Sequence, residues 1–329
     1  MLASIFTMEK ILITGARGQI GTELTTTLRE IYGIDNVIAT DVRSALDDFE
    51  RIGPYEKLDV LDADSLISLI KKNDVGYVYH MAALLSATSE FKPKAAWKIN
   101  MQGLLNVLDA AVETRISKVY WPSSIAVFGP TTPKQNTPQD TIMDPDTVYG
   151  ISKLAGERWC DYYHIKHGLD VRSIRYPGII SHQSPPGGGT TDYAIDIFYE
   201  ALQNNSFHCF IAEDTELPMM YMSDAIRATI ELMESPSENI NIRSSYNVSS
   251  MSFAPKDIYE EIRKHLPHFI INYNPDFRQE IASGWPASID DSKARTDWGW
   301  MPKYDLRSMT ADMLKQIEAK LKNKSVTEI

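Results

Sequence analysis

Tyr149 and Lys153 stand four residues apart in the segment YGISK, and this spacing places both side chains on one face of a helix. An ammonium group beside a phenol favours the phenolate and lowers the pKa of the tyrosine towards working pH. Ser124 lies 25 residues upstream of Tyr149, at the end of a β-rich run, where open α/β sheets bind ligands. The three residues therefore predict a proton relay, in which Tyr149 exchanges a proton with a substrate oxygen that Ser124 orients.

A glycine-rich turn near the N-terminus, GARGQIG over residues 15–21, follows an apolar run and precedes a helical pattern. In this context Gly15 allows a tight turn, Gly18 lets the backbone approach a pyrophosphate, and Gly21 lets helix and strand pack closely. The N-terminus of the helix adds amide donors and positive potential for an anion. The segment therefore predicts a dinucleotide site.

A carboxylate at the end of the next strand defines which dinucleotide is favoured. Asp41 lies 20 residues beyond Gly21, the spacing of a side chain that binds the hydroxyls of the adenosine ribose. Its charge would repel a 2′-phosphate, so NAD is favoured over NADP, although Arg43 is a neighbouring counter-charge. Asp59 and Val60 are expected to end a third short strand, within reach of the adenine.

Short β-rich runs alternate with helical patterns along the chain. Such alternation is typical of an α/β fold with a Rossmann-type doubly wound parallel sheet. The expected strands cover 10–14, 37–40, 77–80, 118–122 and 171–175, and the expected helices cover 19–32, 63–72, 94–114, 149–167, 191–202, 255–266 and 306–322.

The pattern changes after Tyr176, where a cluster of proline and glycine, residues 185–189, marks a candidate substrate loop. We therefore expect an NAD-binding domain over 8–175, with a return of the chain near 219–248. A smaller C-terminal lobe over 176–218 and 249–322 would bind the substrate.

The composition excludes several classes of protein. The formal net charge is −11, from 33 Lys and Arg against 44 Asp and Glu, which disfavours nucleic acid as a partner. No apolar run approaches the roughly 20 residues that span a bilayer, so no membrane association is expected. The two cysteines, Cys160 and Cys209, have no metal-ligand spacing, so neither a disulfide framework nor a metal is expected. We expect buried thiols and a cytoplasmic protein.

Several motifs together resemble the extended short-chain dehydrogenase/reductase family. They are the glycine turn, the Tyr149 and Lys153 pair, Asn100, residues 80–83 (HMAA) and residues 123–129 (SSIAVFG). By that resemblance Tyr149 is the acid/base, Lys153 also binds the nicotinamide ribose, and Ser124 binds the reacting oxygen. Asn100 would support the lysine side of the relay. The resemblance also implies cofactor contacts at Gln19, Ile20, Ala82, Asn100, Tyr176 and Pro177.

Two further stretches, residues 80–90 and 176–194, resemble the short-chain type of L-threonine 3-dehydrogenase. That resemblance implies a small-molecule substrate, L-threonine, which NAD oxidises at the 3-hydroxyl to 2-amino-3-ketobutyrate on the way to glycine or aminoacetone. It implies that Ser86 and the turn of Gly189, Thr190 and Thr191 hold the carboxylate and the amino group. Hydroxyls and the backbone donors of such a turn suit a small zwitterion.

Two alternatives stay open. Many members of the extended family are nucleotide-sugar epimerases or dehydratases, but these need cations for a second pyrophosphate, and residues 217–224 read LPMMYMSD where such enzymes carry a basic and aromatic run. A non-catalytic NAD-binding sensor is the other alternative, and the intact Ser124, Tyr149 and Lys153 count against it. The resemblance further implies a homodimer, formed through the helix after Asn100 and the helix that carries Tyr149.

Overall fold

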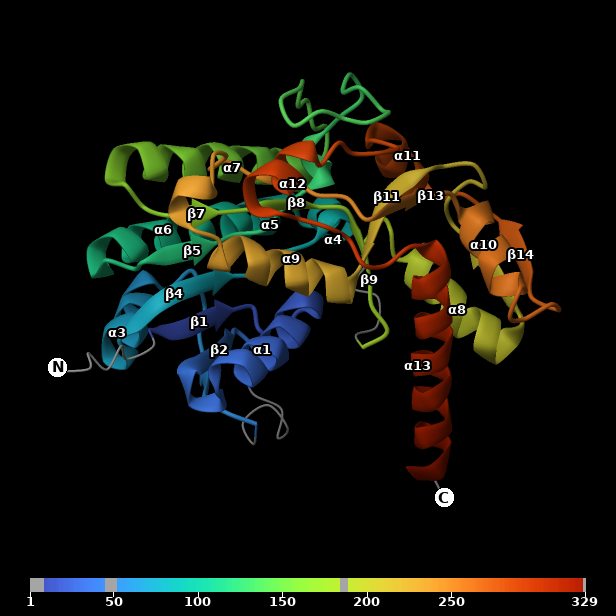
Figure 1. Ribbon diagram of the computed structural model, residues 1–329, viewed down its shortest axis with the longest axis horizontal. Helices are drawn as coiled ribbons and strands as arrows, with labels where there is room; N and C mark the ends of the chain where they lie inside the picture. The colour runs from blue at the N-terminus through green and yellow to red at the C-terminus, as the bar shows by residue number, and fades with distance from the viewer. Residues whose placement is uncertain (1–8, 45–51, 184–188, 328–329) are drawn as a thin grey trace.

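The computed structural model describes residues 9–44, 52–183 and 189–327 (Figure 1). Its centre is a six-stranded parallel sheet in the order β3-β2-β1-β4-β5-β7. The strands are β1 (Lys10–Thr14), β2 (Val37–Asp41), β3 (Tyr55–Lys57), β4 (Val75–His80), β5 (Lys118–Tyr120) and β7 (Val171–Arg172). The predicted Rossmann-type doubly wound sheet is therefore confirmed.

Both faces of this sheet are buried, and β1 shows why its short run is apolar throughout. Leu12 points into a core with three helices, whereas Ile11 and Ile13 belong to the core on the opposite face. The first core lies against α3 (Ala63–Asn73), α6 (Gly103–Thr114) and α7 (Val148–His167). The second lies against α1 (Gln19–Tyr32), α9 (Met222–Glu234) and α12 (Ser292–Trp298). Helices thus cover the sheet on both sides, as Figure 1 shows.

The predicted strand 171–175 is wrong in its continuity. It is broken at Ser173 into β7 and β8 (Ile174–Tyr176), because β7 pairs with β5 whereas β8 pairs with β6 (Ser123–Ser124) and β12 (Tyr246–Asn247). The predicted strand 118–122 likewise stops at Tyr120, and Pro122 follows, which has no N–H for a ladder. Asp59 and Val60 do not end a strand, since β3 stops at Lys57.

The predicted helix over 94–114 is present but is interrupted. Short helices α4 (Ser86–Phe91) and α5 (Pro93–Trp97) lead into a π-helical turn at Lys98–Gln102, after which α6 continues. Such single π turns are frequent at functional sites, and this one carries Asn100.

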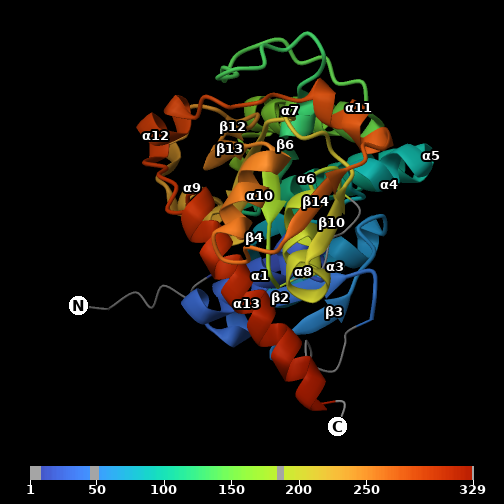
Figure 2. The ribbon, with the colours of Figure 1, turned by 90° about the vertical axis from the view of Figure 1, so that its right-hand side faces the viewer.

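The second half of the chain adds two small sheets and a separate core. A three-stranded sheet has the order β13-β11-β9, and β10 pairs with β14. Helices α8, α10 and α13 pack against one another beside these strands (Figure 2). The bounds are β9 (Gly178–Ile180), α8 (Tyr193–Asn204), β10 (Ser206–Cys209), β11 (Leu217–Tyr221), β13 (Met251–Phe253), α10 (Pro255–Arg263), β14 (Ile270–Tyr273), α11 (Phe277–Gly284) and α13 (Leu306–Thr327). The division into an NAD domain and a substrate lobe stays a prediction.

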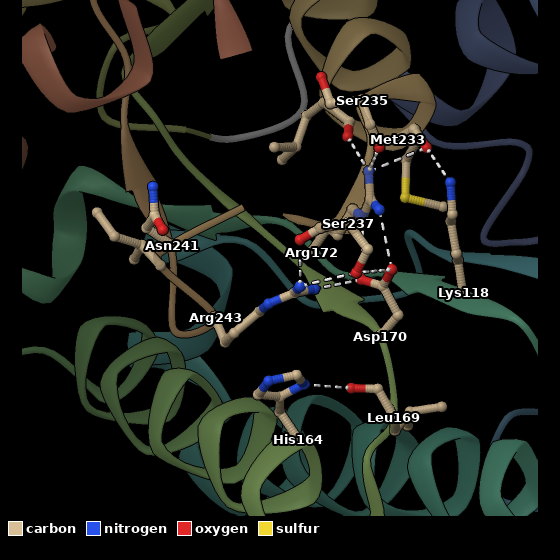
Figure 3. A network of polar contacts seen from close by, with 12 residues as sticks. Lys118, His164, Leu169, Asp170, Arg172, Met233, Ser235, Ser237, Asn241 and Arg243 are labelled. Atoms are coloured by element: carbon tan, nitrogen blue, oxygen red, sulfur yellow. Dashed lines mark hydrogen bonds and ion pairs between the residues drawn. The ribbon is translucent and has the colours of Figure 1, made fainter. Parts of the chain in front are cut away.

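A buried polar network anchors α9 to the edge of the central sheet (Figure 3). Arg172, which is fully buried, donates to Leu232 O in the last turn of α9 and to Ser235 O directly after it, both at 2.6 Å. Lys118 Nζ donates to Met233 O at 2.8 Å. Cations at a helix C-terminus satisfy its free carbonyls and oppose its dipole. Burial opposes ionisation of Asp170, but its hydrogen bonds with Arg172 keep the pKa of that carboxyl below its ordinary value.

Candidate active site

A cavity of about 220 Å³ lies at the C-terminal ends of the central strands. Fourteen of the residues predicted for the site line it, and they come from both halves of the chain. They are Gly15, Gly18, Gln19, Ile20, Gly21, Ser86, Ser124, Tyr149, Lys153, Tyr176, Pro177, Gly189, Thr190 and Thr191. The cavity is therefore the place where the predicted nucleotide, catalytic and substrate residues meet.

The glycine turn forms one end of the cavity, and two of its glycines leave no room for a side chain. Gly15 has φ +68°, and a Cβ there would lie 2.6 Å from the backbone nitrogen of Ala82. A Cβ on Gly21 would lie 2.3 Å from the carbonyl oxygen of Gly15. This tight turn delivers the N-terminus of α1 to the cavity, where first-turn amides can bind an anion.

Gln19 supplies an independent sign of a missing polar partner in this turn. Its side-chain Nε2 is buried and makes no hydrogen bond, although the residue lines the cavity. A buried donor without a partner is costly in a folded protein. An anionic group such as a dinucleotide pyrophosphate fits this donor and the adjacent helix N-terminus.

Asp41 lies at the end of β2, as predicted, but it does not line the cavity. Its carboxylate already accepts hydrogen bonds from two arginines. Its oxygens accept from the backbone nitrogen of Arg17 at 3.2 Å and from Arg43 Nε at 2.9 Å. Burial opposes ionisation, but the hydrogen bonds with Arg43 keep the pKa of Asp41 below its ordinary value. The carboxylate is therefore charged, and it lies beside the half-exposed side chain of Arg43.

Three other predicted cofactor residues lie outside the cavity lining. Asp59 accepts from the backbone nitrogen of Leu61, and the carbonyl of Val60 accepts from Asn106 Nδ2 at 2.9 Å. Ala82 contributes the backbone against which Gly15 packs.

Asn100 also lies behind the cavity wall. Its Oδ1 accepts from Leu84 N at 2.8 Å, and its Nδ2 lies 3.2 Å from Leu84 O and 3.3 Å from Ser152 Oγ. The amide therefore fixes the chain after β4, which lines the cavity at Met81, Ala83 and Leu85. Its link to Lys153 runs through the neighbouring Ser152 and not through a direct hydrogen bond.

Ser124, Tyr149 and Lys153 share one wall of the cavity. Burial raises the pKa of Tyr149 to about 12, and a hydrogen bond with Ser124 acts in the opposite direction. Burial lowers the pKa of Lys153 to about 7, although the nearby charge of Glu157 acts to raise it. The expected effect of the lysine charge on the pKa of Tyr149 stays a prediction, because the same burial that disfavours the phenolate also disfavours the ammonium.

Lys153 has a defined position. Its Nζ donates to the carbonyl of Pro122 at 2.6 Å, and it lies 4.5 Å from the ring centroid of Trp121 and 5.5 Å from that of Tyr149. Because Pro122 directly precedes Ser123 and Ser124, the lysine ties α7 to the strand that carries Ser124.

A buried ion pair stands behind this wall and was not predicted from the sequence. Ser123 Oγ donates to Glu157 Oε1 at 2.7 Å, and Arg175 Nη2 bonds the second oxygen of Glu157 at 2.8 Å. Both charged side chains are almost fully buried. Arg175 also donates to Gln139 O and Asn247 Oδ1, both at 3.0 Å. A helical spacing of four residues from Lys153 was the one available signal for Glu157.

Another part of the cavity lining carries hydroxyl and carboxylate side chains. Ser86 Oγ and Thr190 Oγ1, which lie 104 residues apart in the chain, are 3.5 Å from each other. Gly189 N donates to Asp192 Oδ2 at 2.7 Å, so this turn is closed by a carboxylate at the start of α8. The lining residues that the sequence interpretation missed are Met81, Ala83, Leu85, Pro122, Ser123, Ile125, Gly178, Ile179, Asp192 and Trp285.

Comparisons with known proteins agree with this geometry. Residues 11–249 match the NAD dependent epimerase/dehydratase family. An uncharacterized epimerase/dehydratase of Staphylococcus haemolyticus is 51% identical over 319 residues, which cover 96% of this chain and 100% of that protein.

Solved structures of L-threonine dehydrogenases are also similar. The holo form of a GalE-like L-threonine dehydrogenase from Cupriavidus necator is 55% identical, with a TM-score of 0.92 over 94% of this chain and 99% of that one. A monomeric L-threonine 3-dehydrogenase from a metagenome is 47% identical, with a TM-score of 0.90 over 93% and 98% of the two chains. NAD is therefore the cofactor, and the chain belongs to the NAD dependent epimerase/dehydratase family.

Proposed function

We propose that this enzyme oxidises the 3-hydroxyl of L-threonine with NAD and forms 2-amino-3-ketobutyrate and NADH. The observation that carries the proposal is that a small polar recess, with Ser86, Thr190 and Asp192, shares one cavity with Ser124, Tyr149 and Lys153. Such a recess suits a small zwitterion. The similarity to L-threonine dehydrogenases over nearly the whole chain supports the same substrate.

The glycine turn and the wall beside it would hold the cofactor. When bound, NAD supplies the acceptor for the hydride that leaves carbon 3 of the substrate. Helix α1 would receive the pyrophosphate at its N-terminus, with Gln19 Nε2 as an added donor. The full proposed set is Gly15, Gly18, Gln19, Ile20, Gly21, Asp41, Asp59, Val60, Ala82, Asn100, Lys153, Tyr176 and Pro177.

Tyr149 would take the proton of the 3-hydroxyl as the carbon–oxygen bond becomes a carbonyl. Ser124 is its hydrogen-bond partner, so one hydroxyl both orients the substrate oxygen and lowers the pKa of the phenol. Lys153 would fix the wall through Pro122 and add charge in proportion to its protonation. Asn100 would hold the chain that faces them.

The substrate carboxylate and ammonium need opposite partners. We assign the carboxylate to the hydroxyls of Ser86 and Thr190 and to the turn at Gly189 and Thr191. Asp192 would attract the ammonium, because its nearly buried carboxylate closes the same turn.

The nucleotide-sugar alternative requires cations that this cavity does not offer. Of the described residues that line it, Lys153 is the one basic side chain, and it is bonded to Pro122. A second pyrophosphate would therefore lie without counter-charge. A non-catalytic sensor would not need Ser124, Tyr149 and Lys153 together in one cavity.

The test is NADH absorbance with purified protein, NAD and a panel of L-threonine, L-serine, L-allo-threonine, 3-hydroxybutyrate and UDP-glucose. We expect NADH with L-threonine, and its loss in Tyr149→Phe, which removes the phenol but keeps the ring. NADH formation with 3-hydroxybutyrate and with no other compound of the panel would refute the assignment of an amino acid as the substrate. UDP-glucose turnover without net NADH would instead favour the epimerase reaction.

We also propose a homodimer through α6 and α7. Helix α7 carries Trp159, Tyr162 and Ile165 at 38%, 46% and 72% exposure, and Val112 of α6 is 36% exposed. Apolar groups gathered on one surface favour association. Light scattering decides between this state and a monomer, the state named for one of the related dehydrogenases.

The described helices include none with the length and apolarity that a bilayer crossing requires.

A further inference from the structure

The rings of two exposed phenylalanines from distant parts of the chain are in contact. Phe91 ends α4 and Phe277 begins α11, and their ring centroids lie 5.6 Å apart with an interplanar angle of 74°. Phe91 is 73% exposed and Phe277 is 47% exposed, so neither ring belongs to a core. This edge-to-face arrangement is one of the two that aromatic pairs prefer.

The pair joins the two elements that carry residues of the substrate recess. Helix α4 begins with Ser86, and α11 ends directly before Trp285, and both of these residues line the cavity. Both helices lie on the same side of the molecule in Figure 2. The Phe91–Phe277 contact is thus a bridge between the two walls, outside the cavity itself.

Helix α4 is fixed on its other side to the helix that carries Tyr149. Glu90 Oε1 accepts from the backbone nitrogen of Val148 at 2.8 Å, at the first turn of α7. Helix α11 is fixed to the loop after β10, because Gln279 Oε1 accepts from Ala212 N at 2.7 Å. Each ring therefore stands on an anchored helix, and the contact between them couples the Tyr149 wall to the Trp285 wall.

We propose that Phe91 and Phe277 are positioning residues that clasp these two walls around a bound small amino acid. The inference rests on the proposed function. Because Phe91 is largely exposed and Phe277 is half-exposed, their contact is weak and separates readily, which suits the passage of substrate and product. Binding of the amino acid between the walls would favour the clasped arrangement, and the clasp would favour binding by the same factor.

The first experiment measures steady-state kinetics of Phe91→Ala and Phe277→Ala in the full-length enzyme. We expect KM for L-threonine to rise about two- to tenfold in each, the size of an aromatic pair's coupling. The kcat value and the affinity for NAD should stay unchanged, because neither ring lines the cavity. Phe91→Tyr keeps the ring and should restore the wild-type KM. Ile270→Ala, which also removes an exposed apolar side chain at 58% exposure, is the matched control.

The second experiment compares the double variant with the two single variants, by KM and by thermal midpoint. If the two rings act through their mutual contact, the second substitution should add little to the effect of the first on KM and on the thermal midpoint. Independent effects that multiply in KM, an unchanged KM in either variant, or a changed oligomeric state without a changed KM would overturn the proposal. The thermal midpoints need no turnover, so the coupling of the two rings stays measurable even if L-threonine is not the substrate.

Discussion

Glu157→Gln tests whether the buried ion pair with Arg175 holds the wall of the active site. The substitution keeps the shape of the side chain but removes its charge, and Arg175, at 2% exposure, is left without a counter-ion. Removing one partner of a buried pair costs about 3–5 kcal/mol. The lower end is expected here, because Arg175 keeps its bonds to Gln139 O and Asn247 Oδ1.

The assay is the thermal midpoint followed by circular dichroism, with NADH formation measured on the same samples. With an unfolding entropy of about 2.1 cal/mol/K per residue, a loss of about 3 kcal/mol corresponds to a fall of about 4 °C in the midpoint of a 329-residue chain. Glu56→Gln is the matched control, because Glu56 forms an exposed pair with Lys72 at 2.9 Å, and surface pairs contribute about 0–1 kcal/mol. The variant Glu157→Gln with Arg175→Met should recover much of the loss, since no unpaired charge remains.

The same substitution should change activity through position. Ser123 donates to Glu157, so the loss of charge loosens the strand that carries Ser124, and kcat should fall even below the melting range. If Glu157→Gln melts together with the Glu56→Gln control and keeps its kcat, the reasoning about this network is refuted.

Three further outcomes follow from the site. Gly15→Ala should abolish NAD binding in a calorimetric titration. Gly168 has the same φ of +68° but no atom within 4 Å of the position that a Cβ would take, so Gly168→Ala should retain NAD binding. Equal losses of binding in the two variants would show that backbone strain alone is responsible. Because oxidation needs the phenolate of Tyr149, whose pKa is raised to about 12, kcat/KM should increase with pH over the neutral to alkaline range, and Ser124→Ala should move this rise to higher pH; an unmoved profile would exclude Ser124 as the group that lowers that pKa. Ile165→Asp should convert the proposed dimer to a monomer in light scattering, with the NAD affinity unchanged, and an unaltered mass would place the interface elsewhere.

The nucleotide end of the site was predictable because its information is local. The apolar run of β1, the spacing of Gly15, Gly18 and Gly21, and the helix that follows occupy one continuous stretch. Steric demands at Gly15 and Gly21 come from backbone atoms of the same turn and of the adjacent strand end. Resemblance to a family then placed Ser86 and the turn at Thr190, which no periodicity could connect.

The residues that were missed depend on contacts between distant segments. Trp285 reaches the cavity from the second half of the chain, and Arg175 meets Glu157 only after β8 lies beside α7. Strand breaks at Ser173 have a similar origin, because the partner strand changes from β5 to β6 and β12 at that residue. A propensity pattern registers an extended segment there but carries no information on its neighbours.

The pair of Tyr149 and Lys153 shows where spacing stops being sufficient. A separation of four residues brings an ammonium near a phenol, but the sign of its effect depends on how much water either group retains. Lys153 is buried and Tyr149 is partly buried, and this loss of water raises the pKa of Tyr149 to about 12 and lowers that of Lys153 to about 7. The contact with Pro122 O is independent of that loss of charge, since a neutral amine also donates. We therefore expect the lysine to act first by holding the Ser124 strand against α7, and the hydroxyl of Ser124 to favour the phenolate of Tyr149.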